Sequence, residues 1–190
     1  MKFNPHIHNR RSVRLKEYDY SMPGEYFITI CTKEKECLFG DVVEEEMKHS
    51  QIGVIATHCW EEIPRHFQSV ELDECVVMPN HVHGIIIITD RVENVRHVGI
   101  QHVESLRKNS YQHIVAGSIG VIVRSFKSAV SRLCHLNGHF QFTWQPNYYD
   151  RIIRDEKELN NIREYIRNNP LRWFFDEENP ARDRESPNCK

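Results

Sequence analysis

The segment LDECVVMPNHVHGIIIIT, residues 72–89, carries the strongest structural signal in this chain. It contains two apolar runs rich in β-branched residues, which predict strands over 72–78 and 81–89. The runs are joined by Pro79 and Asn80, residue types that favour a tight reversal of the backbone. The sequence therefore predicts two neighbouring antiparallel strands.

Two histidines stand at the start of the second predicted strand. Successive side chains of a strand point to opposite faces of its sheet, so His81 and His83 project from one side while Val82 points into the core. Imidazole is a common metal ligand, and two on one face can hold the same ion. This spacing predicts a metal site.

A later helix is predicted from a capping-box-like start at Asp155 and Glu158 to its end before Pro170. Within it, Tyr165 and Asn169 are four residues apart and therefore share a side of the helix. Together they offer a phenol and an amide oxygen. Combined with the two histidines, this pair suggests metal-assisted attack by a tyrosine on a phosphodiester.

The remaining periodic segments complete the fold prediction. One amphipathic helix is predicted to begin after Ser50 and to stop at Pro64, and a second is predicted to begin after Ser118. Strands are predicted over 26–32 and 140–144. The order strand, helix, two strands, helix, strand, helix predicts an α+β sandwich of two layers. Its sheet is mostly antiparallel, with helices packed chiefly on one face. The other face is then free to hold a ligand.

Length and composition indicate a single domain with one substantial core, since the chain has 190 residues and 39% hydrophobic content. We expect this domain over 1–175, with a loop insertion at 90–116 where the sequence is polar and aperiodic, and a polar tail at 176–190. No apolar stretch approaches the roughly 20 residues that span a bilayer, and the polar start lacks a secretory signal's apolar segment. We therefore expect a cytoplasmic protein without membrane attachment.

The charges are segregated along the chain. The net charge of −2 argues mildly against a nucleic-acid binder. Basic residues nevertheless gather near the N-terminus and along the helix after Ser118, where no acid occurs between residues 117 and 140. Such segregation can present a basic face on an acidic protein. A merely solvated surface is the alternative for both segments. The candidate DNA contacts on them are Arg10, Arg11, Arg14, Arg124, Lys127 and Arg132.

Four blocks of this sequence, in this order, resemble the single-strand DNA transposases that use one tyrosine and carry an HUH motif (histidine, hydrophobic, histidine). Two of the blocks are similar to the branch called REP-associated tyrosine transposases. The resemblance covers roughly residues 10–172. The HUH block is NHVHG (80–84) and the tyrosine helix is NIREYIRNNP (161–170); the blocks typical of the branch are RRSVRL (10–15) with YFITICT (26–32), and WQPNYYDR (144–151).

The resemblance implies a ferredoxin-like fold and a function in DNA transposition. His81, His83 and Asn169 would hold Mg²⁺ or Mn²⁺. Tyr165 would be the nucleophile of an endonuclease and strand transferase that acts through a 5′-phosphotyrosine intermediate. The resemblance also implies single-stranded or hairpin DNA as the partner, a monomer or a homodimer, and a bacterial protein at the nucleoid.

Other interpretations remain open. A domesticated protein that binds hairpin DNA without turnover is the main alternative, and a nuclease using metal-activated water is another. Imidazole also favours zinc, although no cysteine pair completes a tetrahedral site. Tyr148 and Tyr149 are competing candidates for the nucleophile, which we assign to packing or base stacking. The chain is too short for a (β/α)₈ hydrolase of about 250 residues, and its predicted helices exclude an all-β cupin.

Overall fold

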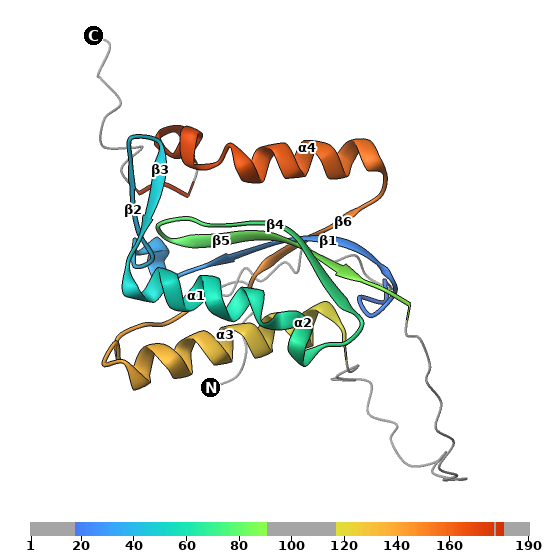
Figure 1. The fold of residues 1–190 in the computed structure, drawn as a ribbon, viewed down its shortest axis with the longest axis horizontal. Helices are drawn as coiled ribbons and strands as arrows, with labels where there is room; N and C mark the ends of the chain where they lie inside the picture. The colour runs from blue at the N-terminus through green and yellow to red at the C-terminus, as the bar shows by residue number, and fades with distance from the viewer. Residues whose placement is uncertain (1–17, 91–116, 177, 181–190) are drawn as a thin grey trace, which may run out of the picture.

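The computed structural model describes residues 18–90, 117–176 and 178–180 (Figure 1). The predicted insertion after residue 90, most of the tail, and the candidate contacts Arg10, Arg11 and Arg14 lie outside these residues. The elements in chain order are β1 (Gly24–Cys31), η1 (Lys33–Lys35), β2 (Gly40–Val43), β3 (Glu46–His49), α1 (Gln51–Glu61), α2 (Ile63–His66), β4 (Val70–Val77), β5 (His81–Ile88), α3 (Ile119–Leu136), β6 (Tyr149–Ile153), α4 (Glu156–Arg167) and η2 (Pro170–Phe175).

Within the described residues, the main sheet has four strands in the order β4-β5-β1-β6, and every neighbouring pair is antiparallel. The two strands predicted around Pro79 and Asn80 are confirmed as β4 and β5. A separate hairpin of β2 and β3, which the sequence analysis did not predict, turns at Glu44 and Glu45. Both of these residues have positive φ, as a two-residue hairpin turn of type I′ requires.

The helices lie on both sides of the sheet, but chiefly on one. Helices α1, α2 and α3 cover one face, and α4 lies across the other (Figure 1). This arrangement confirms the predicted α+β class with its antiparallel sheet. Helix α4 covers part of the face that the sequence analysis expected to be free. In the described part of the chain, no helix combines the length and apolar character needed to cross a membrane.

The larger apolar core lies between the sheet and helices α1 and α3. Trp60 of α1 and Phe126 of α3 meet there edge to face, with ring centroids 5.3 Å apart. Strand β5 approaches this pair through Gly84, where an added Cβ would collide with the indole of Trp60. The glycine next to His83 therefore allows the helix layer to pack directly on the strand that carries both histidines.

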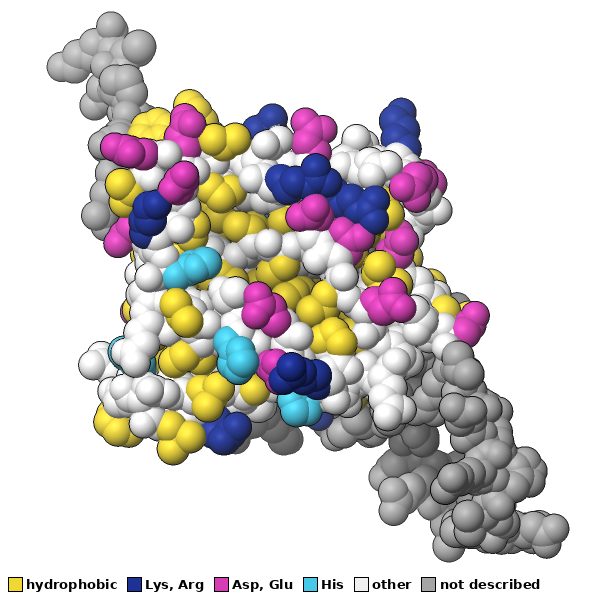
Figure 2. Space-filling model, in the orientation of Figure 1, with side chains coloured by type: hydrophobic (Ala, Val, Ile, Leu, Met, Phe, Trp, Pro, Cys, Tyr) yellow, Lys and Arg dark blue, Asp and Glu magenta, His cyan; other side chains and the backbone are white. Residues whose placement is uncertain are grey.

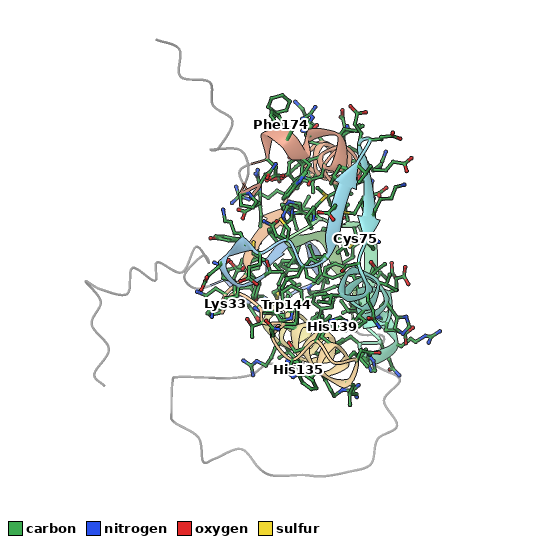
Figure 3. The ribbon with its side chains drawn as sticks, turned by 90° about the vertical axis from the view of Figure 1, so that its left-hand side faces the viewer. Lys33, Cys75, His135, His139, Trp144 and Phe174 are labelled. Atoms are coloured by element: carbon green, nitrogen blue, oxygen red, sulfur yellow. The ribbon has the colours of Figure 1, made fainter. Side chains whose placement is uncertain are left out.

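The predicted strand over 140–144 is wrong, because the fourth strand of the sheet is β6, further along the chain. Phe142 and Trp144 alternate in sequence as strand residues do, but they pack against Phe39 at ring distances of 5.9 and 5.5 Å. Trp144 makes one isolated bridge with Thr32 and donates its indole N–H to the carbonyl of Lys127 in α3. Figure 3 shows Trp144 beside α3. Burial of aromatic rings, rather than pairing in a sheet, explains the pattern.

Candidate functional site

His81 and His83 lie on the α4 face of strand β5, with side chains that are 0% and 4% exposed. Their ring centroids are 4.3 Å apart. Val82, between them, belongs to the apolar core on the opposite face. Because side chains alternate along the strand, the two histidines share the α4 face, and the residue between them in sequence packs in the core.

The ring of His83 is held from β1. Thr29 is its partner in the strand register, and the Thr29 hydroxyl lies 2.8 Å from His83 Nδ1. The imidazole stacks on Phe27 with centroids 5.3 Å apart. These two contacts fix the plane of the ring, so that Nε2 faces α4. The sequence analysis assigned no role to Thr29, since only the register of β1 against β5 places it there.

His81 is oriented by its neighbour Asn80. The Asn80 amide nitrogen donates to the carbonyls of Lys35, at 3.0 Å, and Glu178, at 2.6 Å. Its oxygen is therefore the atom that faces His81 Nδ1, at 2.9 Å. An amide oxygen can only accept, so the imidazole proton sits on Nδ1 and the lone pair on Nε2. Nε2 is buried without a hydrogen-bond partner among the described residues.

Helix α4 brings Tyr165 and Asn169 to the same place. The Tyr165 hydroxyl lies 3.2 Å from His83 Nε2, and its ring meets Phe27 edge to face. Asn169 is 1% exposed, and its side-chain oxygen is buried without a hydrogen-bond partner in the described part of the chain. The four residues that the sequence analysis selected for the site therefore converge in one protomer.

The structure adds Asp176, which the sequence analysis assigned to the tail. One ligand atom each from His81, His83 and Asp176 lie within 4.8 Å of one another. The short helix η2 turns the chain after Asn169, whose amide nitrogen donates to the Asp176 carboxylate at 3.3 Å. The distance in sequence between Asp176 and the other site residues matches neither a strand period nor a helix period, so no local pattern predicts its position. Only the turn of η2 brings it back to the histidines.

Burial favours the neutral form of both imidazoles. Burial, with a smaller contribution from Lys35, lowers the pKa of His81 to about 3, and the side chain of Asn169 opposes this shift. Burial and the neighbouring His81 lower the pKa of His83 well below its usual value, against the effect of Asp176. Neutral imidazole is the form that binds metals.

The donor set fits a divalent cation. Two buried atoms, His81 Nε2 and Asn169 Oδ1, have no hydrogen-bond partner in the described residues, which is costly unless a ligand satisfies them. With His83 Nε2 and the Asp176 carboxylate they make two nitrogen and two oxygen donors. Thr29 and Asn80 contact the Nδ1 atoms of the two imidazoles and so orient the rings, as hydrogen-bonding partners of metal-binding histidines commonly do.

The predicted DNA contacts of α3 lie elsewhere. Helix α3 packs on the sheet face opposite α4 and the histidines. Arg124 and Arg132 are exposed there. Lys127 is half-buried, and its ammonium donates to the carbonyls of Gln145 at 2.5 Å and Asn147 at 3.3 Å. Burial lowers the pKa of Lys127, and the lysine ties the segment before β6 to α3.

Comparison with known proteins places the chain in a family. No model of a known protein family matches it. An uncharacterized protein of Haemophilus influenzae is 46% identical over 177 residues, which cover 93% of this chain and 96% of that protein. The two proteins belong to one family.

Among solved structures, a REP-associated tyrosine transposase bound to a REP hairpin resembles this member of the family. The TM-score is 0.54 and the sequence identity 17%, and the match covers 86% of this chain and 77% of that one. At this identity the likeness shows a shared fold. It is the same fold class that the strand and helix patterns predict.

Proposed function

We propose that this chain is a metal-dependent endonuclease and strand transferase of the single-tyrosine transposase family, acting on hairpin DNA through a 5′-phosphotyrosine intermediate. The observation that carries the proposal is the distance of 3.2 Å between the Tyr165 hydroxyl and His83 Nε2. His83 belongs to the group of metal-ligating side chains with His81 and Asp176. The candidate nucleophile therefore lies next to the candidate metal site. The shared fold with a REP-associated transposase supports the same function.

In this proposal, His81, His83, Asn169 and Asp176 would hold a divalent cation, which would supply polarisation of the scissile phosphate and neutralisation of the charge that develops on it. The residues of the chain supply the rest. Tyr165 Oη forms a bond to phosphorus, the bond from phosphorus to the 3′ oxygen breaks, and the proton lost by the phenol is balanced by one gained at the 3′ oxygen. The link keeps the free energy of a phosphodiester. A second 3′-hydroxyl can then reverse the step, so strand transfer needs no ATP.

We propose Mg²⁺ or Mn²⁺ as the ion. Carboxylate and amide oxygens suit these hard cations, whereas imidazole suits Zn²⁺ and other transition metals. Asp176 and Asn169 together raise the oxygen share of the site to half. A mixed set of nitrogen and oxygen donors of this kind favours Mn²⁺. A zinc site built from thiolates would need cysteine ligands, and no cysteine of the described residues belongs to the cluster.

Single-stranded DNA has aromatic side chains to stack on beside the candidate site, among them those of η2, which lies between Asn169 and Asp176. Tyr149, Phe174 and Phe175 are 51%, 55% and 73% exposed. Phe174 projects outward at the end of the molecule (Figure 3). Base stacking on aromatic rings is tolerant of sequence and holds unpaired nucleotides. In our proposal these side chains hold the strand beside the hairpin, and Arg124 and Arg132 contact phosphates.

The test is covalent capture. The full chain is incubated with a labelled oligonucleotide that carries a hairpin and single-stranded flanks, in Mn²⁺, Mg²⁺ or a chelator, and run on a denaturing protein gel. We expect a shifted, metal-dependent adduct that Tyr165→Phe abolishes. Tyr18→Phe is the matched control, because Tyr18 packs against the apolar core on the opposite face of the sheet, and it should keep the adduct.

Two other results would overturn the proposal in different ways. Metal-dependent cleavage that survives Tyr165→Phe would identify a nuclease that uses activated water. Hairpin binding without cleavage or adduct, in every metal, would identify a binding protein without turnover.

Size-exclusion chromatography with light scattering decides between monomer and homodimer. Mixing Tyr165→Phe with His83→Gln then shows whether the tyrosine acts within its own chain, as its contact with His83 suggests.

A further inference from the structure

Strand β4 contains a bulge at the point where it passes α4. Leu72 pairs with Ile86 and Cys75 with Gly84, so three steps on β4 oppose two steps on β5. Leu72 and Cys75 both pack against the core on the α1 and α3 face. The two residues between them, Asp73 and Glu74, stand opposite a single residue of β5. In a regular strand only one residue would separate two side chains of one face.

Both carboxylates of the bulge are bound to α4. Arg163 makes a bidentate contact with Asp73, with Nε at 3.0 Å from Oδ1 and the terminal nitrogen at 2.6 Å from Oδ2. One turn later, Arg167 Nε lies 2.9 Å from Glu74. Figure 2 shows basic and acidic side chains next to each other over α4 and β4. The bulge thus delivers two consecutive acids to two arginines of one helix.

The arginines and the tyrosine occupy opposite flanks of α4. With 100° per residue, Arg163 is about 200° around the helix axis from Tyr165, and the buried stripe of Leu159, Ile162 and Ile166 lies between the two flanks. One flank is bound to the edge strand β4, and the other faces His83. Rotating the helix by about 20° would move a side-chain tip, about 6 Å from the axis, by about 2 Å.

We propose that Asp73 and Glu74 are positioning residues for the nucleophile: their pairs with Arg163 and Arg167 fix the rotation of α4, so that the Tyr165 hydroxyl faces His83. The inference rests on the proposed function only in calling Tyr165 the nucleophile. An apolar stripe alone sets the helix on the sheet but tolerates small rotations, whereas a bidentate arginine fork has a fixed geometry. The bulge is the feature that makes the double contact possible.

The first experiment reads the position of Tyr165 without DNA or metal. A single 3-fluorotyrosine at position 165 of the full chain is observed by fluorine NMR. We expect Asp73→Asn and Arg163→Gln to shift or broaden its resonance, and Arg163→Lys, which keeps the charge but loses the fork, to do so less. Arg65→Gln is the control, because Arg65 pairs with Glu62 at 2.9 Å at the junction of α1 and α2. An unchanged spectrum in Arg163→Gln and in Asp73→Asn would overturn the inference.

The second experiment reads the chemistry. Single-turnover rates of adduct formation should fall at least tenfold in Asp73→Asn and Arg163→Gln, while hairpin affinity stays within about twofold. A misplacement of about 1 Å can cost up to a hundredfold in rate. Equal losses of affinity and rate, or a rate equal to that of Arg65→Gln, would contradict a positioning role. If the parent forms no adduct, the proposed function fails, and the fluorine spectra still decide whether the pairs set the position of Tyr165.

Discussion

The two faces of the main sheet are built to different rules. On the α1 and α3 face, strand β5 contributes Val82, Gly84 and Ile86 to a large apolar core. On the α4 face, the same strand contributes His81 and His83 to the candidate metal site, while Ile85 and Ile87 pack in the small apolar cluster under α4. One strand therefore serves stability with one set of alternate residues and the candidate chemistry with the other.

The difference shows where polar groups can be buried at acceptable cost. The α4 face leaves His81 Nε2 and Asn169 Oδ1 without partners in the described residues, a penalty that a bound cation would remove. The apolar face supplies the stability that tolerates this penalty. Substitutions on the two faces should therefore differ in kind.

The largest effect is expected at the histidines. His81→Gln or His83→Gln should lower the single-turnover rate of adduct formation by about a thousandfold, because a metal ion contributes several kcal/mol, here about 4, to transition-state stabilisation. Urea unfolding should show a smaller loss of stability than Ile86→Ala produces. A variant that keeps the parent's rate would remove the histidines from the site.

A core substitution on the opposite face should have the reverse signature. Ile86 is fully buried, so Ile86→Ala should lower the free energy of unfolding by about 2–5 kcal/mol, measured in urea. The adduct rate per folded molecule should stay within about twofold of the parent. A large loss of rate at unchanged stability would show that the two faces are not separate.

Metal binding should stabilise the protein through the polar face alone. Mn²⁺ at 100 times its dissociation constant should raise the free energy of unfolding by about 2.7 kcal/mol. The gain should disappear with a chelator and in His81→Gln, while Ile86→Ala should keep it. Thermal melts followed by circular dichroism measure the effect. A gain that persists in His81→Gln would place the ion elsewhere.

Gly84→Ala tests the point where the two faces meet. The added methyl group collides with Trp60 in the apolar core, and relieving the overlap should cost about 1–3 kcal/mol in stability. Because the strand must shift away from α1, His83 should move as well. Metal affinity, measured by calorimetry, should therefore fall together with stability. Unchanged metal affinity would show that β5 absorbs the methyl group without moving the histidines.

The smallest effect concerns pH. The hydrogen bonds from Arg163 lower the pKa of Asp73 below its usual value of 3.8. A carboxyl with a lowered pKa contributes stability above its unfolded-state pKa and loses it as the pH falls through the folded-state value. The stability difference between the parent and Asp73→Asn should therefore be largest near neutral pH and vanish in strong acid. Urea unfolding at several pH values measures it, and a constant difference would contradict the ion pair.

Much of the fold follows from local patterns. The apolar runs around Pro79 and Asn80 predict β4 and β5, and Asp155 with Glu158 predicts the start of α4, where the Asp155 side chain accepts from the Glu158 N–H at 2.8 Å. The alternation of Phe142 and Trp144 led to the wrong prediction of a strand over 140–144, because aromatic rings can alternate in sequence and still fill a core from an irregular segment. The β2 and β3 hairpin is short and mostly exposed, so its sequence carries little apolar signal.

Strand and helix periods are local, so they suffice to predict which side chains share a face: His81 with His83, and Tyr165 with Asn169. The packed fold brings the two pairs together, since their approach depends on β1 lying next to β5 and on the bulge in β4. It also decided the part of Asp176, which reaches the histidines through the turn of η2. Periodicity acts within one element, whereas a site between elements depends on register, bulges and turns that no single segment encodes.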